Sequence, residues 1–156
     1  MTIVALGALG AYATASADSL ATPRADEPQM PSAVEDFAYP NADQILASQG
    51  IKLVRGDGKI TLADCDNNLK QIRVYSYAEG NRKPIYCFTA NSNTGQLSLE
   101  LARVFAIDSG SRALSADLTA EGVTKTVSVA KDSYASVGEG VIGGARSVLV
   151  EIRVTG

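Results

Sequence analysis

Apolar and polar residues alternate with a period of two from residue 51 onward, which is typical of strands that bury one face. Turn signals separate these stretches at intervals of roughly 8–12 residues. The pattern predicts about eight short strands, at 51–54, 60–63, 72–77, 85–89, 97–102, 114–118, 123–129 and 148–154. We therefore expect an all-β fold, a Greek-key or jelly-roll-like sandwich, with a β-barrel as the alternative.

Three local features refine this picture. Residues 42–49 are expected to form one short helix, with Asn41 as its N-cap and Gly50 as its C-terminal stop. The alternation slips at 103–105, which predicts a β-bulge. The last strand alternates most cleanly and predicts one shared face for four apolar residues, Val148, Val150, Ile152 and Val154.

Aromatic residues cluster in the predicted hairpin of 72–77 and 85–89. A four-residue loop at 80–83 would set a register that places aromatic residues opposite one another. The face so formed carries Tyr75, Tyr77, Tyr86 and Phe88 with Arg73 beside them, and the other face carries Ile72, Val74, Ile85 and Cys87. The aromatic face is either covered by the helix or the tail, or is an exposed patch that binds protein or sugar.

The N-terminal part of the chain divides into two segments. Residues 2–17 are uncharged, mostly apolar and end in Ala-Ser-Ala, which predicts a secretory signal peptide over 1–17. This signal is incomplete, because no Lys or Arg precedes its apolar run; an apolar strand is the alternative. Residues 18–34 contain three prolines and no periodicity, so we expect a flexible tail, either a spacer or a docking segment. The single β-domain would then span 35–156.

Secretion makes the two cysteines informative. Cys65 and Cys87 are the only cysteines, and an even number of cysteines in an exported chain predicts a disulfide between them. A metal pair or a reactive thiol are the alternatives. Two cysteines without histidine or a C-x-x-C spacing make a poor metal site, so we expect no bound metal.

Composition excludes several functions for this chain of 156 residues. The net charge of −3 provides no field that would attract nucleic acid, or an anionic membrane after signal cleavage. The absence of histidine removes histidine-based catalysis, and the absence of tryptophan weakens sugar stacking. We therefore expect a protein that is not an enzyme and carries no cofactor.

Carboxylates offer two weak alternatives to this view. Glu100 and Glu151 lie on polar strand faces and could in principle serve glycoside hydrolysis. Asp64, Asp66 and Asn68 have the spacing of a calcium loop, but Leu69 and Tyr75 occupy the positions that require Gly and Glu. A polar turn explains the second group without a metal.

Four stretches carry a resemblance to a known group of proteins. They are VEDFAYP (34–40), GIKLVRGDGKITLADC (50–65), TGQLSLE (94–100) and VEIR (150–153). Together they resemble small secreted single-disulfide proteins of filamentous actinobacteria, mostly of unassigned function, over residues 34–156. The overall build is similar to the adaptor subunit of umbrella-type toxin particles, which links a lectin-like subunit to a long stalk protein. This second resemblance implies an adaptor role and assigns no binding residues.

The sequence thus predicts an extracellular, non-enzymatic module that binds another secreted protein. The tail and the predicted aromatic face are the candidate contact surfaces. Two alternatives remain open: a peptidase inhibitor that uses loop 80–83 or 138–147, and a carbohydrate-binding module with Tyr75 and Tyr86 as platforms.

Overall fold

The computed structural model describes residues 37–67 and 69–156, and the predicted signal and tail lie outside these residues. The described chain forms one α-helix, one short 3-10 turn and ten strands. In chain order these are α1 (Ala42–Gln49), β1 (Lys52–Gly56), β2 (Ile60–Ala63), β3 (Ile72–Ser76), β4 (Ile85–Ala90), β5 (Gly95–Ala102), β6 (Val104–Asp108), β7 (Leu114–Ala120), β8 (Val123–Val129), β9 (Tyr134–Ser136), η1 (Gly138–Gly140) and β10 (Val148–Val154).

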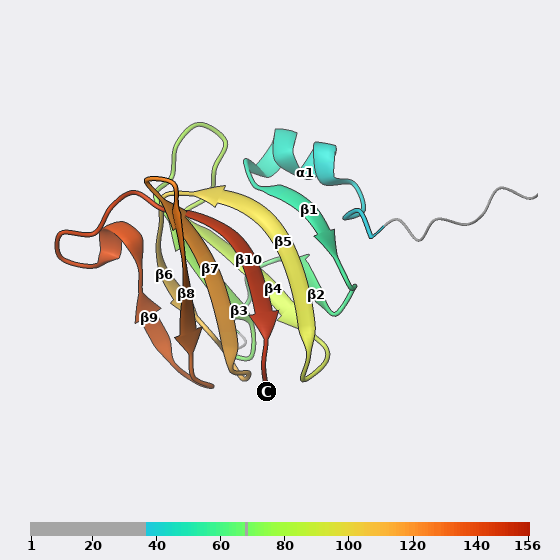
Figure 1. Ribbon diagram of the computed structural model, residues 1–156. Helices are drawn as coiled ribbons and strands as arrows, with labels where there is room; N and C mark the ends of the chain where they lie inside the picture. The colour runs from blue at the N-terminus through green and yellow to red at the C-terminus, as the bar shows by residue number, and fades with distance from the viewer. Residues whose placement is uncertain (1–36, 68) are drawn as a thin grey trace, which may run out of the picture. The chain divides into compact units, whose positions relative to one another are not determined.

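The strands form two five-stranded antiparallel sheets. Sheet A has the order β1-β5-β10-β7-β8, and sheet B has the order β2-β4-β3-β6-β9. In Figure 1, sheet A lies in front of sheet B, and α1 lies beside β1. Both sheets have open edges among the described strands, so the alternative of a closed barrel is wrong. The prediction of an all-β sandwich is confirmed.

The core lies between the sheets and follows the predicted alternation most closely in β5. Leu97, Leu99 and Leu101 are fully buried, whereas Gln96 before them and Glu100 between the last two are exposed. Burying a side chain of this size stabilises the fold by about 1.5–3 kcal/mol. The same clean alternation recurs in β7.

The last strand departs from the predicted alternation because it contains a β-bulge. Its pairing with both neighbours shifts between Leu149 and Glu151. The extra residue reverses the phase, so Leu149 and Ile152 are buried while Val148 is only half-buried. The prediction of four apolar residues on one face is therefore wrong.

The predicted bulge at 103–105 is present and coincides with the point where the chain changes sheets, because Tyr75 pairs with Ala106 and Ser76 with Val104, which leaves Phe105 as the extra residue. Arg103 is the single residue between β5 of sheet A and β6 of sheet B. It adopts a left-handed backbone conformation, with a φ of 58°. Its carbonyl accepts a hydrogen bond from the Tyr77 backbone N–H at 3.1 Å, which ties this corner to the end of β3.

The helix has the predicted bounds, and Asn41 occupies the N-cap position, where its carbonyl accepts a hydrogen bond from the Ile45 N–H at 3.0 Å. Its φ is 56° and its side chain makes no capping bond, so the predicted side-chain cap does not form. Gly50 ends the helix as expected, with a φ of 69° and its N–H bonded to the Leu46 carbonyl. The Asn81 side chain donates to the carbonyls of Leu46 and Ala47, at 3.1 and 2.8 Å, and so joins the helix end to the loop after β3.

Candidate binding surface

The β3–β4 hairpin has a different register from the one that the sequence predicts. Tyr75 pairs with Ile85, whereas the predicted register places Tyr77 opposite Tyr86. The strands end at Ser76 and resume at Ile85, so the loop spans eight residues, 77–84, rather than four. The register differs by three residues, and an odd shift moves the side chains of one strand to the opposite face. The predicted face of four aromatic residues does not form.

Tyr86 and Phe88 belong to the core. Their side chains are 2% and 0% exposed. The Tyr86 hydroxyl donates a hydrogen bond to the Gln49 carbonyl and accepts one from the Lys83 N–H at 2.9 Å. Burial raises the pKa of the Tyr86 phenol above its ordinary value. Neither ring can contact a partner, which also removes one of the two predicted sugar platforms.

The outer face of sheet B nevertheless carries a continuous set of aromatic side chains. We call Tyr75, Tyr77, Phe105 and Tyr134 the aromatic surface. The ring centroids of Tyr75 lie 6.1 Å from Phe105 and 5.9 Å from Tyr134, and those of Tyr77 and Phe105 lie 4.9 Å apart. Tyr77 is 43% exposed and Tyr134 58% exposed. Three strands, β3, β6 and β9, and the start of loop 77–84 therefore supply one apolar patch.

A fixed cation lies at one end of the aromatic surface. The Arg103 guanidinium lies over the Tyr77 ring, 4.7 Å from its centroid. Its Nε and Nη2 each donate to a carboxylate oxygen of Glu139 at 3.0 Å. This pairing lowers the pKa of Glu139 and raises the pKa of Arg103. The Glu139 carboxylate thus holds the guanidinium charged and in a fixed position against the ring.

Phe105, Tyr134 and Arg103 are the residues that the sequence reasoning missed. Phe105 and Arg103 lie at the slip in alternation, where a bulge and a change of sheet coincide and the pattern indicates only the bulge. Tyr134 lies in a strand of three residues, which is too short to show periodicity. The alternation of Tyr75 and Tyr77 was the one available signal, because it placed both on the face that is exposed.

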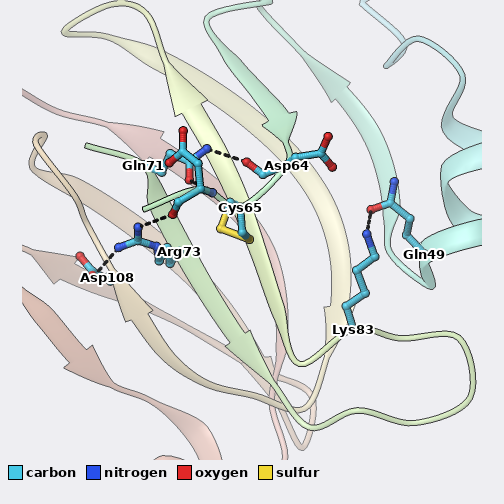
Figure 2. Close-up of a disulfide and its surroundings, with 9 residues drawn as sticks. Gln49, Asp64, Cys65, Gln71, Arg73, Lys83 and Asp108 are labelled. Atoms are coloured by element: carbon cyan, nitrogen blue, oxygen red, sulfur yellow. Dashed lines mark hydrogen bonds and ion pairs between the residues drawn. A yellow bond between two sulfur atoms is a disulfide. The ribbon is translucent and has the colours of Figure 1, made fainter. Parts of the chain in front are cut away.

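Arg73 lies on the same face of β3 as Tyr75 but has structural contacts. Its Nη2 donates to the Asp66 carbonyl at 3.1 Å, and its Nη1 lies 3.9 Å from a carboxylate oxygen of Asp108 (Figure 2). It therefore fixes the turn before β3 at the rim of the aromatic surface. A binding role for Arg73 stays a prediction.

The predicted disulfide between Cys65 and Cys87 is confirmed. Figure 2 shows it beside β4, with the segment around Cys65 held by neighbouring side chains. The Gln71 side chain donates to the Asp64 carbonyl at 2.8 Å and accepts from the Asp66 N–H at 3.2 Å. The disulfide and these bonds together secure the turn between β2 and β3.

The two loops that could serve a peptidase inhibitor differ in their contacts with the rest of the domain. Residues 80–83 are tied to α1 through Asn81 and through Lys83, whose Nζ donates to the Gln49 side chain at 3.0 Å (Figure 2). The segment 138–147 begins with η1 and carries a fully exposed Ile142. Only the second loop projects an apolar side chain.

The two glutamates of the glycoside-hydrolysis alternative form ion pairs. Glu100 pairs with Lys52 at 2.6 Å, and Glu151 pairs with Arg153. Asn68 of the calcium-like spacing lies outside the described residues. Within residues 37–67 and 69–156, no group of three or more metal-ligating side chains could hold a metal ion.

Comparisons with known proteins assign no family. No protein-family model matches the chain, and no curated protein matches it. The resemblance to secreted actinobacterial proteins therefore stays a prediction. None of the helices in the described part of the chain is long and apolar enough to cross a membrane.

Proposed function

We propose that this protein is a secreted, non-enzymatic binding module that recognises another extracellular protein through the aromatic surface. The observation that carries the proposal is the contiguous set of Tyr75, Tyr77, Phe105 and Tyr134 on one sheet face. Tyrosine, phenylalanine and arginine are enriched at the centres of protein interfaces, where they supply most of the binding energy. The disulfide supports an oxidising, extracellular compartment.

The rigidity of the surface favours a binding role over a purely structural one. Three of its rings stand on the strands β3, β6 and β9, and the Arg103 guanidinium donates two hydrogen bonds to the Glu139 carboxylate. Side chains that are ordered before binding lose little conformational entropy when a partner docks. The arrangement thus lowers the cost of association and leaves the apolar area available.

The adaptor role is the finer part of the proposal. An adaptor needs two contact surfaces, and the chain offers the aromatic surface and the predicted tail at 18–34. In this proposal the tail docks on one protein and the aromatic surface on a second. The resemblance to the adaptor of umbrella-type toxin particles suggests components of an extracellular assembly as the two partners.

Affinity capture from culture supernatant of the source organism, followed by mass spectrometry, tests the proposal. The captured protein is then purified, and its dissociation constant is measured with each variant. Tyr77→Ser/Tyr134→Ser should weaken binding about thirtyfold to several hundredfold, because each of the two exposed rings contributes about 1–2 kcal/mol at an interface centre. Val54→Ser, which removes an exposed apolar side chain from sheet A, is the matched control and should leave binding unchanged.

Three outcomes distinguish the parts of the proposal. Unchanged affinity in the double variant would remove the aromatic surface as the site. Loss of one captured protein on deletion of residues 18–34, and of a different one in the double variant, would support the adaptor role. Binding to a glycan array that disappears in the double variant would replace the protein partner with a carbohydrate.

A further inference from the structure

Strand β8 is an edge strand that the structure leaves open. It pairs with β7 through all seven of its residues, and no described strand pairs with its other side. It contains no proline, and its one charged residue, Lys125, pairs with the buried Leu118 and so lies on the inner face, where it is the single protecting charge of this edge. Seven residues of open edge strand are a template for pairing with another chain.

The other three edges of the two sheets are short or covered. Strands β2 and β9 have four and three residues. Strand β1 is flanked by residues 37–39, because the Tyr39 N–H donates to the Val54 carbonyl and the Gly56 N–H to the Phe37 carbonyl, each at 3.0 Å. Among the described edge strands, β8 alone is both long and uncovered.

An apolar groove runs beside β8. Because β9 is so short, sheet B leaves the inward side chains of β8 partly uncovered. The groove has a volume of about 480 Å³ and is lined by Val123 and Val127 from β8 and by Val137 and Val141 from the segment around η1. Val123 is 58% exposed. An open strand edge next to an apolar groove is the arrangement that accepts an added strand.

The sequence of β8 is complementary to itself. In an antiparallel pair centred on Thr126, Val123 lies opposite Val129 of a second copy, and Lys125 lies opposite Val127. A pair centred on Thr126 includes all seven residues of β8 and places no two like charges directly opposite each other. Glu121 lies in the turn before β8 and Lys131 in the turn after it, so this centre brings the Glu121 turn of one copy to the end of the pair that carries Lys131 of the other, twice by symmetry. Both residues are exposed, and neither forms an ion pair within the described residues.

We propose that the protein forms a two-fold symmetric dimer in which β8 pairs with β8 of a second copy around Thr126. The pairing joins the two A sheets into one continuous sheet and satisfies the open backbone groups of both edges. The opposite charges of Glu121 and Lys131 select a second copy of this chain as the occupant. The inference is independent of the aromatic surface and does not rest on the proposed function.

Sedimentation of the full chain over a wide range of concentrations tests the dimer. Thr124→Lys/Ser128→Lys places lysines directly opposite one another in both symmetric pairs, because residues 124 and 128 are partners in this register. It should raise the dissociation constant about tenfold or more. The matched variant Thr124→Lys/Ser128→Glu places opposite charges there and should dimerise at least as tightly as the wild type.

Both positions are exposed on the outer face of sheet A, and thermal unfolding verifies that each monomer remains folded. A second pair of variants tests the pairing of Glu121 with Lys131 in the flanking turns. Glu121→Lys should weaken the dimer, and Glu121→Lys/Lys131→Glu should restore it.

Several results would overturn the proposal. A sedimentation coefficient that stays at the monomer value at every concentration would do so. A monomer in which the β8 amides on the side away from β7 are protected from hydrogen exchange would instead indicate that another segment of the same chain occupies the edge. A dimer that Thr124→Lys/Ser128→Lys and Thr124→Lys/Ser128→Glu weaken equally would place the interface or the register elsewhere.

Discussion

The substitution Tyr86→Phe tests the register of the β3–β4 hairpin most directly. In the structure Tyr86 points into the core, and its hydroxyl bonds to the Gln49 carbonyl and the Lys83 N–H. In the register that the sequence predicts, the same hydroxyl would lie on the aromatic face with Tyr77. Removing one oxygen atom therefore has different consequences in the two arrangements.

The magnitude follows from the two groups that lose their partner. A buried donor or acceptor left without a hydrogen bond costs about 1–3 kcal/mol, and Tyr86 itself is 2% exposed. Gln49 is half-buried and Lys83 is exposed, so water replaces part of the loss. We expect the free energy of unfolding to fall by about 2 kcal/mol, the lower part of the range for two groups. In a domain of this size that is a decrease of roughly 5–10 °C in Tm.

Calorimetry or urea unfolding measures this change, and Tyr77→Phe is the matched control. The Tyr77 ring is 43% exposed, so its variant should stay within about 0.5 kcal/mol of the wild type. Spectrophotometric titration adds a second readout, because burial raises the pKa of Tyr86 and its late ionisation should be missing from Tyr86→Phe. Equal stability of the wild type and Tyr86→Phe, with a normal tyrosine titration in both, would refute the buried position of Tyr86.

Three further predictions follow from contacts elsewhere. Replacing Cys65 and Cys87 by serine should lower the free energy of unfolding by about 3 kcal/mol, because the disulfide closes a loop of 22 residues; an unchanged urea midpoint would contradict this. Glu139→Gln should destabilise at neutral pH and converge with the wild type in acid. Arg103 lowers the pKa of Glu139, so the ion pair stabilises the fold fully above the ordinary pKa of a carboxyl group. This stabilisation is lost as the pH falls through the lowered pKa of Glu139 in the folded protein. Parallel curves of Tm against pH for the wild type and Glu139→Gln would count against this prediction. Gly50→Ala should cost about 1–3 kcal/mol in calorimetry, because φ is 69° and the new Cβ would lie 2.8 Å from the Arg82 backbone nitrogen; an unchanged Tm would argue against that strain.

The sequence predicts the fold class and the position of most strands because alternation reports burial directly. Leu97, Leu99 and Leu101 are buried as their spacing requires. The helix end at Gly50 was equally predictable, since a glycine after an amphipathic stretch favours the left-handed conformation found there. The disulfide followed from the cysteine count and the predicted secretion.

The binding surface was predicted only in part because register is not a local property. Gly80 and Asn81 are good turn residues, and they suggested a tight loop at 80–83. The chain instead forms a longer loop, in which Asn81 caps the end of α1 and the Ser76 N–H donates to the Pro84 carbonyl at 3.0 Å. Contacts with an element about 35 residues away therefore set which face of β4 is buried. No pattern within the hairpin contains that information.

The place of β10 in sheet A has a consequence for the order in which the chain folds. This strand, at residues 148–154, lies at the centre of sheet A between β5 and β7. Until it has been synthesised, β5 and β7 have no common partner, and one backbone edge of each remains unpaired. Pairing β5 with β10 also closes a loop of about fifty residues, a non-local step that makes folding slow. Sheet A can therefore be completed only once nearly all of the chain is available, although every strand of sheet B precedes this point. A chain cut short before β10 would lack the strand that joins the two halves of sheet A.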